Sequence, residues 1–309
     1  MERNVFDTII IGGGPGGYTA ALYAARAGFS ALVLEKLSPG GQMATTDQID
    51  NYPGFPQGVN GFELALEMQK GAQRFGAQTE LAEVLRVDLR GPMKEVVTQK
   101  ETYRAPTVVL ATGASPRELG LPGERELRGR GVSYCATCDG MFYRGKTVAV
   151  VGGGNTAAAD VLYLSRLCEK VYLIHRRDQL RASRVYLEPL KQAENVEILW
   201  DSQVTELLYG ETLTGAKVRH KKTGETRELS LDGLFLAVGQ LPNTQLFQGQ
   251  VELDAAGCVV ADETTRTNLP GVFAVGDLRQ KPLRQVVTAA ADGAVAAHFL
   301  EEYLSQRQQ

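Results

Sequence analysis

Two thiols stand two residues apart in the segment YCATCDG, residues 134–140. A Cys-x-x-Cys pair can ligate a metal, close a structural disulfide or carry electrons as a reversible dithiol. Structural zinc normally takes four ligands, but the other two cysteines are single and the three histidines are scattered. A redox pair explains more, because Asp139 supplies a carboxyl group for the protons that disulfide reduction consumes. We therefore predict that Cys135, Cys138 and Asp139 are catalytic and that no metal is bound, although Asp139 could instead cap a helix.

The composition is that of an ordinary globular protein. The 309 residues suffice for two domains, and 33 Lys and Arg against 36 Asp and Glu give a net charge of −3. This balance argues against nucleic acid and membrane surfaces as partners. No apolar stretch could cross a bilayer, and glycines interrupt the first apolar run too early for a signal peptide. Four cysteines are too few for a disulfide framework, which favours a reducing compartment, the cytoplasm.

The same strand–turn–helix–strand pattern occurs twice. The copies read DTIIIGGGPGGYTAALYAARAGFSALVLEK and TVAVVGGGNTAAADVLYLSRLCEKVYLIHRR, beginning at Asp7 and Thr147. Each has a β-branched run, a glycine cluster, a small-residue helix and a second apolar run, which is typical of βαβ units in a buried parallel sheet.

Each glycine cluster has the spacing of a dinucleotide-binding turn. The first glycine makes the tight turn, the second lets the backbone approach a pyrophosphate, and the third position must be small so that helix and strand can pack. Two copies in the same context predict two dinucleotide sites rather than two merely tight turns. The positions are Gly12, Gly14 and Gly17 in the first copy, and Gly152, Gly154 and Ala157 in the second.

The residues at the end of each second strand predict different nucleotides. Glu35 can accept hydrogen bonds from a ribose 2′-hydroxyl and would repel a 2′-phosphate. The second copy has His175 at the equivalent position, followed by three arginines that suit a 2′-phosphate: Arg176, Arg177 and Arg181. We expect NADPH in the second copy, while His175 could equally be a packed core residue.

Alternating stretches follow each copy and lead to apolar strands that end in Gly113 and Gly239. Polar, Pro-containing segments follow these glycines and are natural linkers. We predict an α/β fold with two Rossmann-like three-layer dinucleotide-binding domains, the second inserted into the first. The expected boundaries are 1–115 and 245–309 for the domain with the first glycine cluster and 116–244 for an NADPH-binding domain that carries the cysteine pair.

The returning C-terminal segment favours a flavin in the first domain. The strand VFAVGD ends in Gly276 and Asp277, and Arg284 and Gln285 precede an Ala-rich helix. A carboxylate at such a strand end can hold a ribityl hydroxyl, and a helix N-terminus can stabilise negative charge on a reduced flavin. The small residues of this helix could also serve close packing alone.

Taken together, these motifs resemble the low-molecular-weight NADPH-dependent thioredoxin reductases, a branch of the flavin-dependent pyridine nucleotide–disulfide oxidoreductases. GGGPGG, GGQM, DNYPGFP, ATGAS, CATCDG, GGGNTA, HRRDQLRAS and AVGD…RQVVTAA occur in the family's order from about Asp7 to about Leu300. CATCDG just ahead of the second glycine cluster, followed by HRR, is the most specific combination, because it separates this branch from the flavoenzymes that carry the redox cysteines in the first module.

The resemblance implies the following sites. FAD would be bound by Gly12, Gly14, Pro15, Gly17, Glu35, Gly41, Gln42, Asn51, Gly113, Gly276, Asp277, Arg284 and Gln285. NADPH would be bound by Gly152, Gly154, Asn155, Thr156, His175, Arg176, Arg177 and Arg181. Cys138 would face the flavin, Cys135 would attack the disulfide of oxidised thioredoxin, and Asp139 would move protons. A homodimer with domain rotation is also implied.

One departure and several alternatives remain. Ala159 replaces the first of two acids that are common in the family, and Asp160 keeps the second. The same chemistry could serve another acceptor, either a different thioredoxin-like protein or a small disulfide compound. A dithiol oxidase that uses O₂ fits the three arginines poorly. A flavin-binding sensor without turnover would be bleached by NADPH but not reoxidised by a disulfide.

Overall fold

The computed structural model describes residues 4–46 and 48–307, which form two compact units. The first unit comprises residues up to Ser115 and from Leu241 onward, and the second is Pro116–Gln240, inserted into the first. The chain thus returns to the first unit between Gln240 and Leu241. The boundary expected from the sequence was four residues later, after residue 244. The segments that connect the units are β8 (Ala114–Pro116) and β17 (Gln240–Pro242), which pair as a two-stranded sheet.

The first unit is built on a five-stranded parallel sheet. Its strands are, in spatial order, β18 (Val272–Ala274), β7 (Thr107–Leu110), β1 (Thr8–Ile11), β2 (Ala31–Glu35) and β3 (Gln78–Leu81). Its helices are α1 (Pro15–Arg26), α2 (Gly61–Gln73) and α6 (Val286–Arg307), with short 3₁₀ turns η1 (Gly41–Thr45), η3 (Gln245–Phe247) and η4 (Gly276–Leu278). An antiparallel sheet contains β4 (Val84–Asp88), β5 (Lys94–Thr98) and β6 (Thr102–Ala105).

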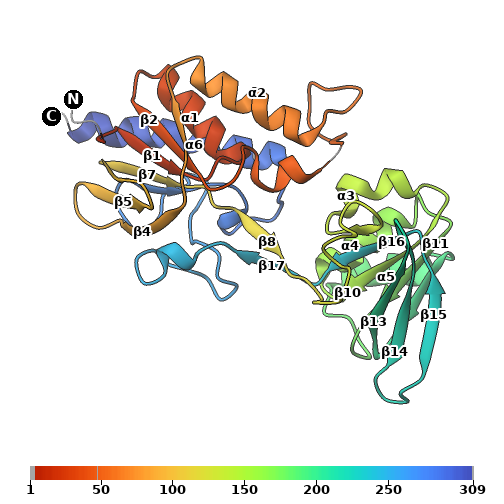
Figure 1. The fold of residues 1–309 in the computed structure, drawn as a ribbon. Helices are drawn as coiled ribbons and strands as arrows, with labels where there is room; N and C mark the ends of the chain where they lie inside the picture. The colour runs from red at the N-terminus through yellow and green to blue at the C-terminus, as the bar shows by residue number, and fades with distance from the viewer. Residues whose placement is uncertain (1–3, 47, 308–309) are drawn as a thin grey trace. The chain divides into compact units, whose positions relative to one another are not determined.

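Alternation along the central strand explains the layers of this unit. Ile9 and Ile11 of β1 join an apolar cluster that includes Val87 and Val96 of the antiparallel sheet, whereas Ile10 joins a cluster with Ala24 and other residues of the helices. Successive side chains of a strand point to opposite faces, so a strand that is apolar on both must be covered on both. The helices accordingly gather on one side and β4 and β5 on the other (Figure 1).

The second unit repeats this plan. Its parallel sheet contains β12 (Val196–Leu199), β11 (Lys170–Ile174), β10 (Thr147–Gly152), β16 (Gly233–Ala237) and β9 (Val132–Ser133). The antiparallel sheet contains β13 (Ser202–Tyr209), β14 (Leu213–His220) and β15 (Thr226–Ser230). The helices are α3 (Ala136–Asp139), α4 (Asn155–Leu164) and α5 (Arg184–Gln192), with the 3₁₀ turn η2 (Gly140–Tyr143).

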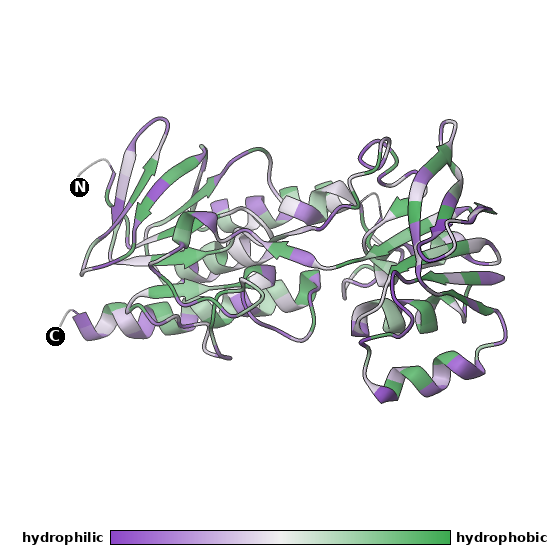
Figure 2. Cartoon of the chain, turned by 90° about the horizontal axis from the view of Figure 1, so that it is seen from below, coloured by the Kyte–Doolittle hydropathy of each residue, from purple (hydrophilic) through white to green (hydrophobic). Residues whose placement is uncertain are grey.

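Both faces of the second parallel sheet are buried as well. Val148 and Val150 of β10 pack in the cluster that contains residues of α4, whereas Ala149 and Val151 pack with the antiparallel sheet. The central strands of both units are mainly hydrophobic (Figure 2). The α/β fold with an inserted second domain, predicted from the sequence, is confirmed. In the part of the chain that the structure describes, no helix has both the length and the apolar content to span a bilayer.

Candidate active site

The first glycine turn lies at the carboxyl end of β1, the central strand of its sheet. Gly12 has φ +109°, and a Cβ there would overlap the carbonyl oxygen of Ala111, while a Cβ on Gly17 would overlap the carbonyl oxygen of Gly12. A Cβ on Gly14 would meet nothing within 4 Å. The turn is therefore closed on its protein side and open at Gly14, the position at which a pyrophosphate must approach the backbone.

Other predicted residues surround this turn. Pro15 is the first residue of α1. Proline has no backbone N–H, and at this position the helix loses no hydrogen bond because of it. Gly40 N donates to Gly13 O at 2.7 Å, and a Cβ on Gly41 would lie 3.9 Å from Gly14 Cα, so the start of η1 lies beside the open face. Gln42 is exposed in the same turn. The fold therefore brings the GGQ and GGGPG segments together.

Glu35 ends β2 with its carboxylate directed at the glycine turn. Its Oε2 accepts a hydrogen bond from Gly13 N at 2.7 Å, and its Oε1 accepts one from Leu37 N at 3.0 Å. A carboxylate retains further lone pairs after two such bonds, so it can still accept from ribose hydroxyl groups. Its negative charge at the end of the turn disfavours a 2′-phosphate.

The returning segment packs onto the same turn. A Cβ on Gly16 would lie 3.0 Å from Val275 Cγ2 and 3.1 Å from Ala289 O, which places the start of α1 against η4 and α6. Gly276, with φ +70°, and Asp277 follow Val275 directly. Burial raises the pKa of the Asp277 carboxyl group, and the positive charges of Arg284 and Lys281 oppose that rise.

Arg284 and Gln285 lie immediately before α6. Gln285 Oε1 accepts a hydrogen bond from Asn51 Nδ2 at 3.0 Å, which joins two predicted residues far apart in the sequence. Arg284 Nη2 donates to the buried Cys258 Sγ at 3.5 Å. Its Nε is buried and has no hydrogen-bond partner among residues 4–46 and 48–307. A buried donor normally finds a partner, so this guanidinium is suited to a polar group that a bound molecule would supply.

Gly113 (φ +65°) lies between β7 and β8, and its carbonyl oxygen accepts from Asn243 N at 3.0 Å.

The second glycine turn has the same design at the end of β10. A Cβ on Gly152 would lie 2.6 Å from both Ala157 Cβ and Ala237 O, whereas one on Gly154 would meet nothing within 4 Å. Asn155 and Thr156 are exposed at the start of α4, and Asn155 Oδ1 accepts from Ser183 N at 2.8 Å. This turn, too, is open only where a phosphate must approach.

His175 lies beneath this turn rather than in solvent. His175 is only 5% exposed, and a Cβ on Gly153 would overlap the imidazole ring. Nδ1 lies 2.8 Å from Gly152 O and Nε2 lies 3.0 Å from Gln179 O. The imidazole thus ties the glycine turn to the loop that follows β11.

Three arginines are exposed on that loop. Arg176 and Arg177 follow His175 directly, and Arg181 N donates to Gly153 O at 2.7 Å, which draws the loop onto the glycine turn. Exposed guanidinium groups next to such a glycine turn are chemically suited to bind a phosphate. The structure therefore brings the loop with the basic residues to the open turn, while the buried His175 contacts both the turn and this loop.

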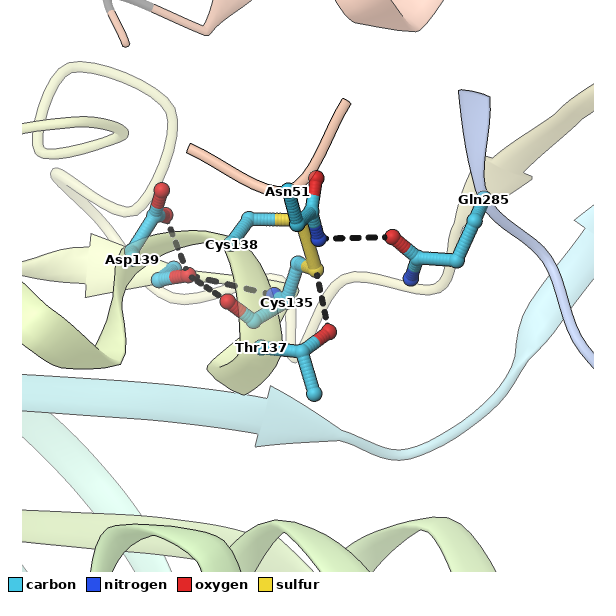
Figure 3. Close-up of a disulfide and its surroundings, with 7 residues drawn as sticks. Asn51, Cys135, Thr137, Cys138, Asp139 and Gln285 are labelled. Atoms are coloured by element: carbon cyan, nitrogen blue, oxygen red, sulfur yellow. Dashed lines mark hydrogen bonds between the residues drawn. A yellow bond between two sulfur atoms is a disulfide. The ribbon is translucent and has the colours of Figure 1, made fainter. Parts of the chain in front are cut away.

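Cys135 and Cys138 form a disulfide, with their Cα atoms 5.3 Å apart (Figure 3). Cys135 is the N-cap of α3 and Cys138 lies within it; both are partly buried. Thr137 Oγ1 lies 3.5 Å from Cys135 Sγ. The two other cysteines, Cys168 and Cys258, are buried and unpaired. The described residues contain no group of three or more His, Cys, Asp or Glu side chains arranged to hold a metal.

Asp139 is held in place by a residue that the sequence did not single out. Ser133 Oγ donates to Asp139 Oδ2 at 2.6 Å and accepts from Cys135 N at 3.1 Å. Ser133 belongs to a parallel strand and Asp139 to a helix that follows it. The fold therefore fixes the orientation of the carboxyl group on the residue that directly follows Cys138.

Residues 6–293 match the model of the pyridine nucleotide-disulphide oxidoreductase family. The chain belongs to this family. The oxidoreductase is 45% identical over 307 residues to a thioredoxin reductase of Mycolicibacterium smegmatis, covering 99% of both chains, and 44% identical to one of Treponema pallidum, covering 100% of both. The crystal structure of a thioredoxin reductase from Streptococcus pyogenes superposes with a TM-score of 0.90 at 40% identity, covering 99% of this chain and 100% of that one.

These similarities confirm the resemblance that the motifs indicated. The protein is a pyridine nucleotide-disulphide oxidoreductase with a disulfide at its redox centre. Ser133, Thr137 and Cys258 are among the residues close to the predicted site residues that sequence reasoning missed. A hydroxyl residue close before CATCDG was a usable signal for Ser133. No local pattern marked Cys258, which meets Arg284 only through the fold.

Proposed function

We propose that this oxidoreductase is a thioredoxin reductase that passes electrons from NADPH through FAD and the Cys135–Cys138 pair to oxidised thioredoxin. The observation that carries the proposal is the disulfide, which lies in the same unit as a glycine turn flanked by three exposed arginines. The printed names of the relatives point to the same acceptor. The net reaction converts NADPH, a proton and a protein disulfide into NADP⁺ and a dithiol.

FAD fits the first unit, the residues up to Ser115 and from Leu241 onward. The open face at Gly14 would receive its pyrophosphate and Glu35 the ribose of its adenosine part. Arg284 Nε, which has no hydrogen-bond partner in the described part of the chain, is suited to a polar group of the flavin half, and so are the Gln285–Asn51 pair and Asp277. When bound, FAD would accept a hydride from NADPH and deliver two electrons to the disulfide.

NADPH fits the second unit, Pro116–Gln240. Gly152, Gly154, Asn155 and Thr156 would bind its pyrophosphate, and Arg176, Arg177 and Arg181 its 2′-phosphate. His175 would act from beneath, because both of its ring nitrogens already meet carbonyl groups of the protein. Two charge-assisted hydrogen bonds of about 1.5–3 kcal/mol each would favour NADPH over NADH by about 10²- to 10⁴-fold.

Cys135, Cys138 and Asp139 would have different roles in the disulfide exchange. After the pair is reduced, the Cys135 thiolate would attack the disulfide of thioredoxin, and Cys138 would then displace the mixed disulfide and restore the internal bridge. Asp139, oriented by Ser133, would donate and accept the protons. We further propose a homodimer, as the family resemblance implies, and a cytoplasmic location, as the small number of cysteines suggests.

The test is oxidation of NADPH by the purified protein with oxidised thioredoxin as the sole acceptor. Consumption of NADPH in large excess over enzyme, abolished in a Cys138→Ser variant, supports the proposal. Bleaching of a bound flavin without turnover retains both nucleotide sites but excludes thioredoxin. In that case a small disulfide or another thioredoxin-like protein becomes the candidate acceptor.

A further inference from the structure

Three charged side chains are buried together behind the Gly276–Asp277 turn of the first unit. They are Arg279, Lys281 and Asp292, whose side chains are only 5%, 4% and 9% exposed. Asp292 lies on α6, and the two cations lie in the segment between η4 and that helix. Charged groups are almost never buried unless paired, so this arrangement needs a physical account.

Asp292 is the centre of this ionic cluster. Its Oδ2 accepts hydrogen bonds from Gly276 N and Arg279 Nε, both at 2.9 Å, and from Lys281 Nζ at 2.7 Å. Its Oδ1 accepts from Arg279 Nη2 at 2.8 Å, which completes a bidentate pair. The carboxylate thus binds α6 directly to the backbone of the turn. These bonds lower the pKa of Asp292, although burial alone would raise it.

The two cations make additional bonds to carbonyl groups. Arg279 Nη1 lies 3.3 Å from the carbonyl oxygens of Ala261, Asp262 and Gln280, and Lys281 Nζ lies 3.2 Å from that of Thr288. Carbonyl groups satisfy donors but cancel no charge. Two cations with one anion therefore leave the cluster with one positive charge in excess, and burial keeps solvent from screening it.

The charged side chains of the cluster act on the turn in front of them. Burial raises the pKa of the Asp277 carboxyl group, the positive charges of Arg284 and Lys281 oppose this rise, and the negative charge of Asp292 adds to it. Gly276 N is held by Asp292, so the position of the turn and the charge behind it depend on the same three side chains. The N-terminus of α6, five residues beyond Lys281, adds positive potential of the same sign.

We propose that Arg279, Lys281 and Asp292 form an electrostatic support for the flavin site, which fixes the Gly276–Asp277 turn and makes the bound flavin easier to reduce. The inference rests on the proposed function, which places the flavin at this turn. A net positive charge favours the anionic reduced flavin over the neutral oxidised form. Lys281 acts mainly through charge, whereas Asp292 also positions the turn.

The test is the midpoint potential of the bound flavin in variants that change the cluster charge in opposite directions. Lys281→Met removes the excess charge and leaves the bidentate Arg279–Asp292 pair, so its potential should become more negative. We expect the ratio of reduced to oxidised flavin at a fixed poise to fall about tenfold, a shift of about 30 mV for a two-electron couple. Asp292→Asn raises the cluster charge and should shift the potential in the positive direction. Lys281→Arg should match the wild type.

Lys70→Met is the matched control, because it removes a lysine from an exposed ion pair with Glu67 on α2. Its potential should equal that of the wild type. Shifts of opposite sign in Lys281→Met and Asp292→Asn support the inference, since a purely structural role gives no reason for the sign to follow the charge. An unchanged potential in Lys281→Met with flavin still bound overturns it, even if Asp292→Asn fails to fold. A wild-type protein that binds no flavin contradicts the proposed function as well.

Discussion

The backbone N–H of Gly13 donates a 2.7 Å hydrogen bond to the side chain of Glu35. The second unit ties its own glycine turn in an equivalent way, but with His175 Nδ1 at 2.8 Å from Gly152 O. In both units, a side chain at the end of the second strand of the βαβ unit (β2 or β11) contacts the backbone of the glycine turn after the first strand (β1 or β10). One copy places a negative charge there, and the other uses an imidazole beneath three exposed arginines.

This difference predicts nucleotide selectivity. Replacing Arg176 and Arg177 with Ala should raise the apparent KM for NADPH about 10²- to 10⁴-fold and leave that for NADH nearly unchanged, because only NADPH has a 2′-phosphate. Steady-state kinetics with each nucleotide measure the effect. Arg219→Ala, an exposed change on β14, is the control. Equal losses for both nucleotides would rule out recognition of the 2′-phosphate by this pair.

Substitutions at two glycines of the first turn should have different effects, one on flavin binding and the other on protein stability. Gly14→Val should leave the fold intact, because a Cβ there meets nothing within 4 Å, but should weaken flavin binding by occupying the open face. Gly17→Ala should instead destabilise the protein by several kcal/mol, on the order of an overpacked core, because its Cβ would overlap Gly12 O. Flavin content and thermal unfolding of the two variants check this. A stable Gly17→Ala protein would contradict it.

The disulfide predicts where the flow of electrons stops. In Cys138→Ser the flavin should still be reduced by NADPH in a single turnover, while reduction of the disulfide substrate falls at least about 10³-fold because the internal bridge cannot form. Stopped-flow absorbance follows the first step and NADPH consumption the second. Cys168→Ser, at a buried unpaired thiol, should keep both steps. Normal turnover in Cys138→Ser would remove this pair from the mechanism.

The Ser133–Asp139 hydrogen bond predicts a graded effect on proton transfer. Asp139→Asn should slow disulfide reduction about 10²-fold or more, the usual contribution of a positioned acid or base. Ser133→Ala should slow it less, since the carboxyl group remains and only its orientation is lost. Reduction of the flavin by NADPH should be unaffected in both. A pH–rate profile that Asp139→Asn leaves unchanged would show that this carboxyl group carries no proton in the reaction.

Asp160 predicts a pH dependence of stability. Burial in the second unit raises its pKa from 3.8 to about 7. The folded state therefore binds this proton more tightly than the unfolded chain. The resulting contribution to stability is complete below pH 4 and is lost as the pH rises through 7.

Asp160→Asn should remove this dependence and raise the free energy of unfolding at pH 8 by about 2–4 kcal/mol. Thermal unfolding of the wild type and the variant at pH 5 and pH 8 measures it. Asp178→Asn, at an exposed ion pair with Lys222, is the control and should change little. Parallel pH dependence of wild type and Asp160→Asn would contradict the prediction.

Much of the chemistry could be predicted because it lies in contiguous motifs. Gly12, Gly14 and Gly17 specify a turn through backbone sterics within six residues, and the positions of Glu35 and Arg176 follow from the length of one βαβ unit. The cysteine pair is likewise local. These features depend on φ and ψ angles and on strand and helix periodicity, which neighbouring residues largely determine.

The tertiary structure alone decided how distant residues meet. Neither Asp292 with Arg279 and Lys281 nor Arg284 with Cys258 forms any spacing pattern that the sequence could reveal. His175 was ambiguous in the sequence, and its burial beneath Gly153 gives it a supporting position. Such contacts arise from the packing of helices and loops onto a sheet, where side-chain direction and burial depend on the whole fold. The sequence by itself therefore determined which groups are candidates for the chemistry, and the tertiary structure decided which other groups contact them and hold them in place.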